Sequence, residues 1–598
     1  ETLPRSYVLE RGGNIDVRYR ALGNDVYGFT MPLADVAMGE TLVIDPMPRI
    51  AWATYIGGDG RDGASSVATL TDGSVIVAGQ TRSANRIATA GSFRTTIEPE
   101  NWDGFVVAFD NKGQKMWGTY FGGDAWDVAM AVAVSDNGDI FLTGWSDSQT
   151  GIATAGSHKP MNDGTRDGFL CRFTSTGQRL WGSFVGGEGW DVSNDVAITP
   201  EGNVVVVGWT KSLQGIASES SFQQQYGGSE CDAFLAVYSP DGIRQWGTYY
   251  GGAGWDVANA VAVSPLGDII VVGWTDSKSV VVATDGHQQS PGGQQDGFVA
   301  RFLGDGRLRW GSFYGGSNED QITDVTVTKS GHIVVVGQTK STTDIATEGA
   351  HLQQLIGEGN SAFIASFERS GGRLWGTYYG GEGEDLALSV AMTPSDDIAV
   401  VGCTQSWTDI STDSSLQSAY GGGNWDGFAA IFGQAGQRTW GSYFGGDGAD
   451  IIRSVDVASN GSVLLAGESG SASNVATENS HQSQLVGEND AFLAIVQISP
   501  STNVNNESGN KTHAKIASLR PNPATGYTVV TTSATTDAVL IVVDVLGRVL
   551  VSQPIAAGET TTTISTSGLP SGSYYLRLEP VAGTGNVQAH TQALIVVP

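Results

Sequence analysis

Two series of aspartates are the residues of this sequence whose type and spacing could support acid–base chemistry or metal binding. The first series precedes an alternating apolar run in every copy of a long repeat, at Asp62, Asp127, Asp191, Asp256, Asp320, Asp385 and Asp450. The second precedes a later apolar run, at Asp103, Asp167, Asp232, Asp296, Asp426 and Asp490, with Ser361 in the fifth copy. A catalytic carboxylate pair is unique within an enzyme, and a calcium loop needs several oxygen ligands close together. We therefore expect each aspartate to cap backbone N–H groups of its own turn, and we predict no catalytic residue, metal site or cofactor.

The histidines and cysteines are also spread in a way that argues against a metal centre. Four histidines share one position of the repeat, so a ring of repeats would hold them far apart: His158, His287, His351 and His481. The three cysteines fall at different positions of different copies and show no ligand spacing: Cys171, Cys231 and Cys403. We expect the histidines to pack or cap, and the cysteines to be buried or half-buried thiols.

Tryptophans that occur in only some copies of the repeat are the candidate binding residues. They precede the first strand and follow the second strand of three consecutive copies, at Trp126, Trp145, Trp190, Trp209, Trp255 and Trp274. The other copies hold Arg, Glu, Gln, Cys or Ala at these positions. The two strands should form a hairpin, so both positions should lie at one face of the molecule. Two interpretations stay open: packing between repeats, or an aromatic platform for sugar rings or a partner protein.

A repeat that begins with the phrase Trp117–Gly123 positions all these residues. The same phrase begins at Trp52, Trp181, Trp246, Trp310, Trp375 and Trp440, and successive copies are 65, 64, 65, 64, 65 and 65 residues apart. One unit reads as four short strands, at 127–134, 139–145, 167–173 and 179–184. Seven tandem units of this kind predict an all-β fold, a seven-bladed β-propeller of four-stranded blades.

The order of the strands along the chain predicts how the ring closes. The repeat region, residues 49–500, begins with a lone fourth strand at 49–56 and ends after a third strand at 490–498. Pairing of these two segments would complete the last blade and remove two exposed sheet edges. We therefore expect residues 49–56 to be the closing strand.

The regions on either side of the repeat differ from it in composition. Residues 1–48 alternate in short runs and are predicted to be an N-terminal β segment, the tail of an upstream region. The chain starts at Glu1 without Met or a signal peptide, which fits a removed leader or a fragment. Residues 501–518 have the composition of a linker, and residues 519–598 predict a small Ig-like β-sandwich.

The composition limits the partners that the protein can have. The chain of 598 residues has a formal net charge of −30, with 32 Lys and Arg against 62 Asp and Glu. Such a surface disfavours nucleic acid and anionic membranes, and no apolar run is long enough to span a bilayer. We therefore expect no nucleic acid and no membrane span. The expected partner is a polysaccharide or a protein, including a second copy of this chain.

The repeat unit resembles a known bacterial family. The phrase Trp117–Gly123, the following Asp127 and the later Asp167-Gly168-Phe169 are similar to the bacterial seven-bladed β-propeller (SBBP) repeat, and the similarity covers residues 49–500. This resemblance implies a secreted or surface protein without a defined biochemical activity.

The C-terminal region resembles the type A sorting domain of the type IX secretion system. Its landmarks occur in the order found in that family: Leu-Arg-Pro-Asn-Pro at 519–523, Asp-Val-Leu-Gly-Arg-Val at 544–549 and Leu-Pro-Ser-Gly-Ser-Tyr-Tyr at 569–575. The resemblance implies export through the type IX secretion machinery. It also implies an extracellular or outer cell-surface location.

These features together predict a secreted binding or structural protein without catalytic activity. The alternative is an extracellular carbohydrate-active hydrolase or lyase that uses one propeller face. An enzyme needs a cluster of acid, base or nucleophile that is not repeated around the ring. The non-repeated charges at the face of interest are scattered over different copies: Arg61, Glu319, Glu384 and Glu468.

Overall fold

The computed structural model describes most of the repeat region and the strands of the two flanking segments. The described residues of the repeat region are 48–97, 101–228, 230–278 and 286–498. The chain divides into two compact units, of which one is Pro48–Pro500 and the other combines Glu1–Met47 with Ser501–Pro598. Most of the predicted linker, residues 501–515, lies outside the described residues.

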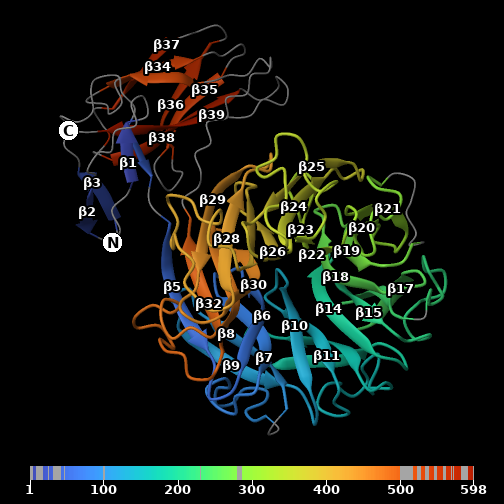
Figure 1. Cartoon of the computed structure of the whole chain (residues 1–598). Coiled ribbons are helices and arrows are strands. Elements are labelled where there is room, and N and C mark those ends of the chain that lie inside the picture. Colours follow the sequence, from blue (N-terminus) through green and yellow to red (C-terminus); the bar gives the residue numbers. More distant parts are fainter. Residues whose placement is uncertain are drawn as a thin grey trace. The chain divides into compact units, whose positions relative to one another are not determined.

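The unit Pro48–Pro500 is a propeller of seven four-stranded antiparallel sheets (Figure 1). In each blade the strands A, B, C and D follow one another in the sheet, and the A strands of neighbouring blades contact each other. The colours of Figure 1 run around the ring from β6 in blue to β30 in orange, and these two A strands are also in contact. The predicted seven-bladed β-propeller is therefore confirmed.

The first four blades have the following strands. Blade 1 contains β6 (Asp62–Thr69), β7 (Val75–Thr81), β8 (Asp103–Phe109) and β9 (Lys115–Phe121). Blade 2 contains β10 (Asp127–Val134), β11 (Ile140–Ser146), β12 (Asp167–Phe173) and β13 (Arg179–Val185). Blade 3 contains β14 (Asp191–Ile198), β15 (Val204–Thr210), β16 (Asp232–Tyr238) and β17 (Arg244–Tyr250). Blade 4 contains β18 (Asp256–Val263), β19 (Ile269–Thr275), β20 (Asp296–Phe302) and β21 (Leu308–Tyr314).

The remaining blades continue the same pattern. Blade 5 contains β22 (Asp320–Val327), β23 (Ile333–Thr339), β24 (Ser361–Phe367) and β25 (Arg373–Tyr379). Blade 6 contains β26 (Asp385–Met392), β27 (Ile398–Thr404), β28 (Asp426–Phe432) and β29 (Arg438–Phe444). Blade 7 contains β30 (Asp450–Val457), β31 (Ser462–Ser469), β32 (Asp490–Gln497) and β5 (Arg49–Ile56).

Blade 7 joins the two ends of the repeat region. Strand β5 pairs antiparallel with β32, with Ile56 opposite Ala491 and Thr54 opposite Leu493. The last four residues of β5 are buried, so the strand contributes to the core as well as to the ladder. The closing strand expected at 49–56 is therefore confirmed.

The B and C strands form the middle of each blade. Every residue of β8, β16 and β24 is buried, which explains why these strands read as continuous apolar runs rather than alternating ones. The A strands alternate more and leave part-exposed residues, as in β6. Neighbouring blades therefore share their cores through the faces of strands B and C.

Two recurrent glycines of the repeat are required by close backbone approaches. A Cβ on Gly144 of β11 would lie 1.9 Å from the carbonyl oxygen of Val128 on the facing A strand, where the ladder has a β-bulge. A Cβ on Gly123, the second glycine of the phrase, would lie 1.9 Å from the carbonyl oxygen of Thr150. Any larger residue would therefore push the B strand or the B–C connection out of place.

The long connection between strands B and C runs along the outer edge of its blade. In blade 2 the Thr154 N–H donates to the Gly182 carbonyl at 2.8 Å, and the Phe184 N–H donates to the Lys159 carbonyl at 3.0 Å. The connection thus covers the edge of the D strand, which would otherwise be free to pair with another chain. It does not stay at the face of the tryptophans, which is where the sequence placed it.

The aspartates of the first series cap their turns as predicted. In all seven blades the second glycine of the phrase donates its N–H to the aspartate, with N···O distances between 2.7 Å and 3.0 Å. Asp191 also accepts hydrogen bonds from Ser212 at 2.7 Å and from the Thr210 hydroxyl. Aspartates of the second series accept backbone N–H groups at five positions: Asp167, Asp232, Asp296, Asp426 and Asp490.

We expect the propeller to be more stable at about pH 5 than at about pH 8. Burial raises the pKa of Asp62 to about 6 and that of Asp232 to about 7, from 3.8. The folded protein therefore binds protons that the unfolded chain has lost, and this stability disappears as the pH rises through 6 and 7. Buried histidines act in the opposite direction, since burial lowers the pKa of His351 to about 4, but they are fewer than the aspartates. Thermal unfolding across this range checks the sign, and a melting temperature that rises towards pH 8 would contradict it.

The second unit contains short sheets. The N-terminal strands β1 (Arg5–Val8) and β4 (Leu42–Asp45) pair with each other, as do β2 (Arg18–Gly23) and β3 (Val26–Thr30). The C-terminal strands form a three-stranded sheet of β33 (Ile516–Arg520), β34 (Tyr527–Thr532) and β37 (Thr561–Ser565). They also form a four-stranded sheet of β36 (Val549–Ile555), β35 (Ala538–Val543), β38 (Gly572–Pro580) and β39 (His590–Val596).

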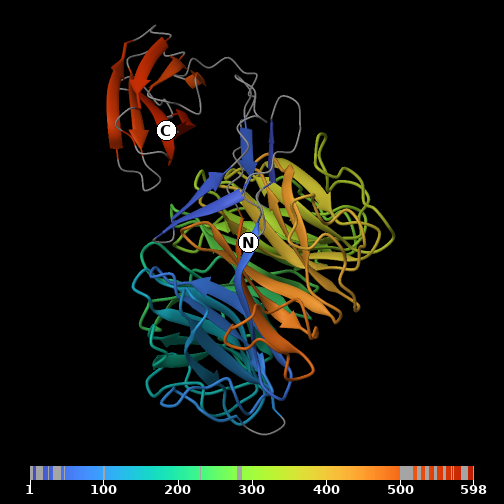
Figure 2. The same cartoon turned by 90° about the vertical axis from the view of Figure 1, so that its left-hand side faces the viewer.

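One apolar core joins the two C-terminal sheets. Val530 and Ile564 from the first sheet lie in the same buried cluster as Leu540 and Leu576 from the second. Two sheets that share a core in this way form a β-sandwich, whose strands are red in Figure 2. The sandwich predicted for this region is therefore confirmed.

Candidate functional site

The structure brings the two tryptophans of each hairpin to the same end of the blade. In blade 2, Trp126 directly precedes β10, and Trp145 lies in β11 opposite Val128. The Asp147 N–H, just after β11, donates to the Trp126 carbonyl at 2.8 Å. Trp190 and Trp209 of blade 3, and Trp255 and Trp274 of blade 4, have the same arrangement.

None of the six predicted tryptophans is buried. Trp126 is 43% exposed and Trp190 is 50% exposed, so the rings before the A strands project most of all. The other four are half-buried: Trp145, Trp209, Trp255 and Trp274. This degree of exposure leaves ring surface available to a ligand, whereas tryptophans that only fill a core are covered.

A cation links the tryptophans of blades 2 and 3. The Arg166 guanidinium, just before β12, lies 3.7 Å from the centre of the Trp145 ring and 5.7 Å from that of Trp190. Its position is fixed by two hydrogen bonds to Asp147, of 2.8 Å and 2.9 Å, and by a backbone bridge to Trp190. The rings are therefore held in place by an ordered charge pair rather than by apolar packing alone.

Two further cation–aromatic contacts extend this pattern. The Lys211 ammonium of blade 3 lies 4.7 Å from the centre of the Trp255 ring of blade 4. In blade 1 the Arg82 guanidinium lies 4.9 Å from the centre of the Trp102 ring, whose backbone carbonyl accepts the Asp127 N–H at 2.8 Å. We call the six predicted tryptophans, together with Trp102, Arg166 and Lys211, the aromatic surface.

Sequence comparison of the repeats missed part of this surface. Trp102 and Arg166 share a third position, directly before strand C, which becomes relevant only because it pairs with the start of the next blade. The sequence also gave no reason to single out Trp407, which is 78% exposed and stacks on Tyr420 with ring centres 5.6 Å apart. Alignment of every position of the repeat, including the B–C connections, would have exposed both signals.

The unique charges at this face show no arrangement suited to catalysis. Arg61 pairs with Glu488 at 2.6 Å, Glu319 pairs with Lys340 at 2.6 Å, and Glu468 pairs with Arg453. Each pair belongs to a different part of the ring, and none has a second carboxylate as a partner. Within the described residues, no three His, Cys, Asp or Glu side chains come close enough to hold a metal ion.

The histidines and cysteines lie in the packing. His351 contacts Phe432 of the next blade with ring centres 5.9 Å apart, and His158 contacts Tyr238 in the same way at 6.1 Å. All three cysteines are buried as free thiols. No helix in the described part of the chain is long and apolar enough to cross a membrane.

The C-terminal region matches a known protein family. Residues 518–591 match the model of the secretion system C-terminal sorting domain. The C-terminal region is a sorting domain. A sorting domain of the type IX system directs export, so the protein is secreted to the outer surface or the extracellular space, and its sorting domain interacts with the secretion machinery.

Comparisons for the propeller are more distant. Part of the chain is similar to the regulatory protein FlaEY of Caulobacter vibrioides, with 26% identity over 320 residues. These residues are 49% of this chain and 31% of that protein, so the match covers about a third of its length.

Solved structures with a related arrangement share little sequence with this chain. One is a fungal alcohol oxidase of the AA5 family in complex with copper, with 14% identity, a TM-score of 0.37, and coverage of 92% of this chain and 100% of that one. Another is a puromycin hydrolase variant, with 13% identity, a TM-score of 0.36, and coverage of 69% and 50%.

Proposed function

We propose that the exported propeller is a non-catalytic binding protein whose aromatic surface holds a polysaccharide. The observation that carries this proposal is the exposure of six tryptophans that are concentrated on three consecutive blades. We also assign the repeat to the SBBP type on the phrase shared by all seven copies. The resemblance to that family adds support for a surface protein without catalytic activity.

Packing between blades is a weaker explanation for these tryptophans. The backbone contact at this point is the same where no tryptophan is present, since Lys340 donates its N–H to the Glu319 carbonyl at 2.9 Å. The same bond joins Gln405 to Glu384 at 2.8 Å. Four junctions therefore keep this geometry with Arg, Glu or Ala before strand A. The large rings are not needed to form a junction, which leaves a role at the surface.

A polysaccharide fits the chemistry of the aromatic surface better than a protein partner. Sugar rings stack their apolar C–H faces on exposed indoles, and their hydroxyl groups need fixed donors and acceptors nearby. Arg166 and Asp147 supply such a donor and acceptor beside Trp145 and Trp190. Equivalent rings on consecutive blades would meet successive units of a linear polymer.

Binding of the full chain to an array of extracellular polysaccharides and oligosaccharides tests this function. We expect retention of a polymer class, with affinity that increases with chain length as more rings are engaged. The bound polymer is then incubated with the protein, and new reducing ends are measured. We expect no release of products, because the surface holds no acid–base cluster. Turnover would favour the hydrolase or lyase alternative, and binding of proteins but of no glycan would overturn the proposal.

A further inference from the structure

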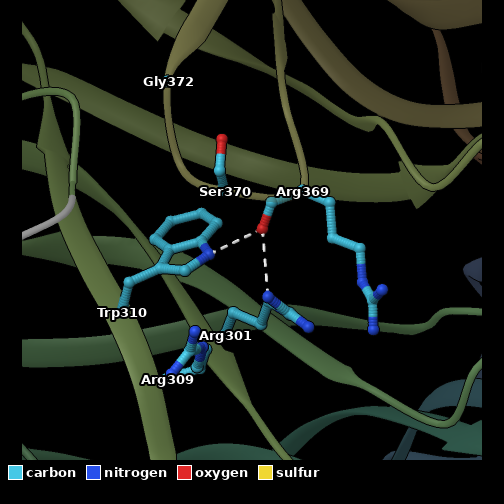
Figure 3. A pocket seen from close by; sticks show the side chains of 6 residues that line it. All are labelled: Arg301, Arg309, Trp310, Arg369, Ser370 and Gly372. Atoms are coloured by element: carbon cyan, nitrogen blue, oxygen red, sulfur yellow. Dashed lines mark hydrogen bonds between the residues drawn. The ribbon is translucent and has the colours of Figure 1, made fainter.

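A basic hollow lies between blades 4 and 5, away from the aromatic surface. Its volume is about 620 Å³, and it is lined by Arg301, Arg309, Trp310, Arg369, Ser370 and Gly372. Arg301 is near the end of β20, whereas the aromatic surface is formed where the C strands begin. We call these six residues the arginine pocket (Figure 3).

The charge of the arginine pocket contrasts with that of the chain. Three of its lining residues are arginines and none is acidic, although the chain as a whole has a formal net charge of −30. The nearest carboxylate that pairs with them is Asp268, which is buried behind the lining and accepts hydrogen bonds from Arg301 at 2.9 Å and from Arg369 at 2.7 Å. One carboxylate thus balances three guanidinium groups.

The framework of the arginine pocket is well ordered. The Arg369 backbone carbonyl accepts hydrogen bonds from the Trp310 indole at 2.9 Å and from the Arg301 guanidinium at 3.1 Å, as Figure 3 shows. Arg301 is only 7% exposed, and Trp310 is only 2% exposed. Both are locked by packing, so the pocket is pre-formed.

Unused donors remain in the arginine pocket. The Nε atom of Arg301 is buried and has no hydrogen-bond partner among the described residues. Arg309 is exposed and forms neither an ion pair nor a hydrogen bond with any described residue. A guanidinium that finds no carboxylate in a chain with 62 acidic residues is available to an external anion.

Blades 2 and 3 show which residues belong to the framework and which are additional. There Arg172 binds Asp139 at 2.7 Å, and the Trp181 indole donates to the Pro240 carbonyl at 3.0 Å. The Nε atom of Arg172 is also without a partner, so this feature belongs to the shared framework. Leu180 and Pro240 occupy the positions of Arg309 and Arg369. The framework therefore forms without these two arginines, and they have no structural purpose in common with it.

We propose that the arginine pocket binds a small molecule that carries a tetrahedral oxyanion, a sulfate or phosphate monoester. Guanidinium groups present paired N–H donors that match the oxygens of such a group. The volume exceeds that of a free ion and falls within the range of roughly 300–1,000 Å³ typical of small-ligand pockets. The ester group would lie against Arg309 and Arg301, and the remainder of the molecule would fill the hollow.

Titration of the full chain with glucose 6-sulfate and glucose 6-phosphate tests the proposal, with glucose, acetate and inorganic sulfate as further probes at constant ionic strength. We expect one or both esters to bind at a single site, and glucose and acetate to bind more weakly by about tenfold or more. The R309Q variant should lower the affinity for the ester by about tenfold, because it removes one charge-assisted hydrogen bond without breaking any internal contact.

The R307Q variant is the matched control. Arg307 is an exposed neighbour that pairs with Asp305 at 2.9 Å and does not line the pocket, so its loss changes the net charge equally. We expect ester binding by R307Q to equal that of the wild type. Failure of both esters to bind, binding of inorganic sulfate alone, or equal losses in R309Q and R307Q would each overturn the proposal. None of these outcomes bears on polysaccharide binding at the aromatic surface.

Discussion

Removal of residues 1–56 is expected to abolish the single cooperative unfolding transition of the propeller and to cause aggregation. Strand β5 supplies the outer strand of blade 7, and its residues Tyr55 and Ile56 are almost completely buried. The Tyr55 hydroxyl donates to the Ser471 carbonyl at 2.5 Å, and Thr54 exchanges hydrogen bonds with Gln482. Without β5, the whole length of β32 becomes an unpaired edge that can pair with another chain. We expect the melting temperature to fall by at least about 10 °C.

A rearranged chain separates the loss of this strand from the loss of the N-terminal segment. In this variant residues 1–56 are deleted, and residues 49–56 are inserted after residue 498 through a turn copied from another blade. The inserted strand can then pair with β32 as in the native chain, so thermal unfolding should again be cooperative and close to that of the wild type. If the truncated chain melts like the wild type, β5 does not hold the ring closed.

Replacement of a capping aspartate by alanine is the second change with a large expected effect. Asp385 is buried and accepts hydrogen bonds from the Gly381 N–H at 2.9 Å, from Ser406 at 2.8 Å and from the Thr404 hydroxyl. Asp385→Ala removes the common acceptor of these buried donors, so we expect the free energy of unfolding to fall by about 3 kcal/mol or more. Denaturant unfolding at constant pH measures this difference.

Glu382→Ala provides the control for charge. Glu382 lies exposed in the same turn, and its replacement removes one carboxylate without removing a buried acceptor. We expect its free energy of unfolding to stay within about 0.5 kcal/mol of the wild type. Equal effects of the two substitutions would show that the aspartates act through net charge and not as caps.

The architecture could be predicted from the sequence because each of its causes is local and repeated. The phrase at Trp117–Gly123 marks a D strand and its close-packed glycines, and it recurs at every blade. The position of the orphan strand at 49–56 follows from counting strands, and the pairing with β32 agrees with that count. The role of the aspartates was visible for the same reason, because a residue present in all copies serves the fold.

The details of the aromatic surface could not be predicted in the same way. The type and face of Trp145 and Trp190 follow from hairpin geometry, but their exposure depends on what the neighbouring blade places beside them. Arg166 reaches both rings only because the end of one B–C connection pairs with the start of the next blade. The arginine pocket combines Arg301, Arg309 and Arg369 from two blades, and no local pattern links these positions.

The central claim is that the exposed tryptophans bind a ligand and do not hold the blades together. It is tested most directly by measuring polysaccharide affinity and melting temperature in parallel for Trp190→Ala and Trp117→Ala. Trp190 is 50% exposed, whereas Trp117 is only 8% exposed and its indole donates to the Ser175 carbonyl at 2.8 Å. We predict that Trp190→Ala lowers affinity by about 1–3 kcal/mol without a change in melting temperature. Trp117→Ala should lower stability by about 3–5 kcal/mol and leave the affinity of the folded protein unchanged. Unchanged affinity in Trp190→Ala, or a loss of stability as large as that of Trp117→Ala, would contradict the claim.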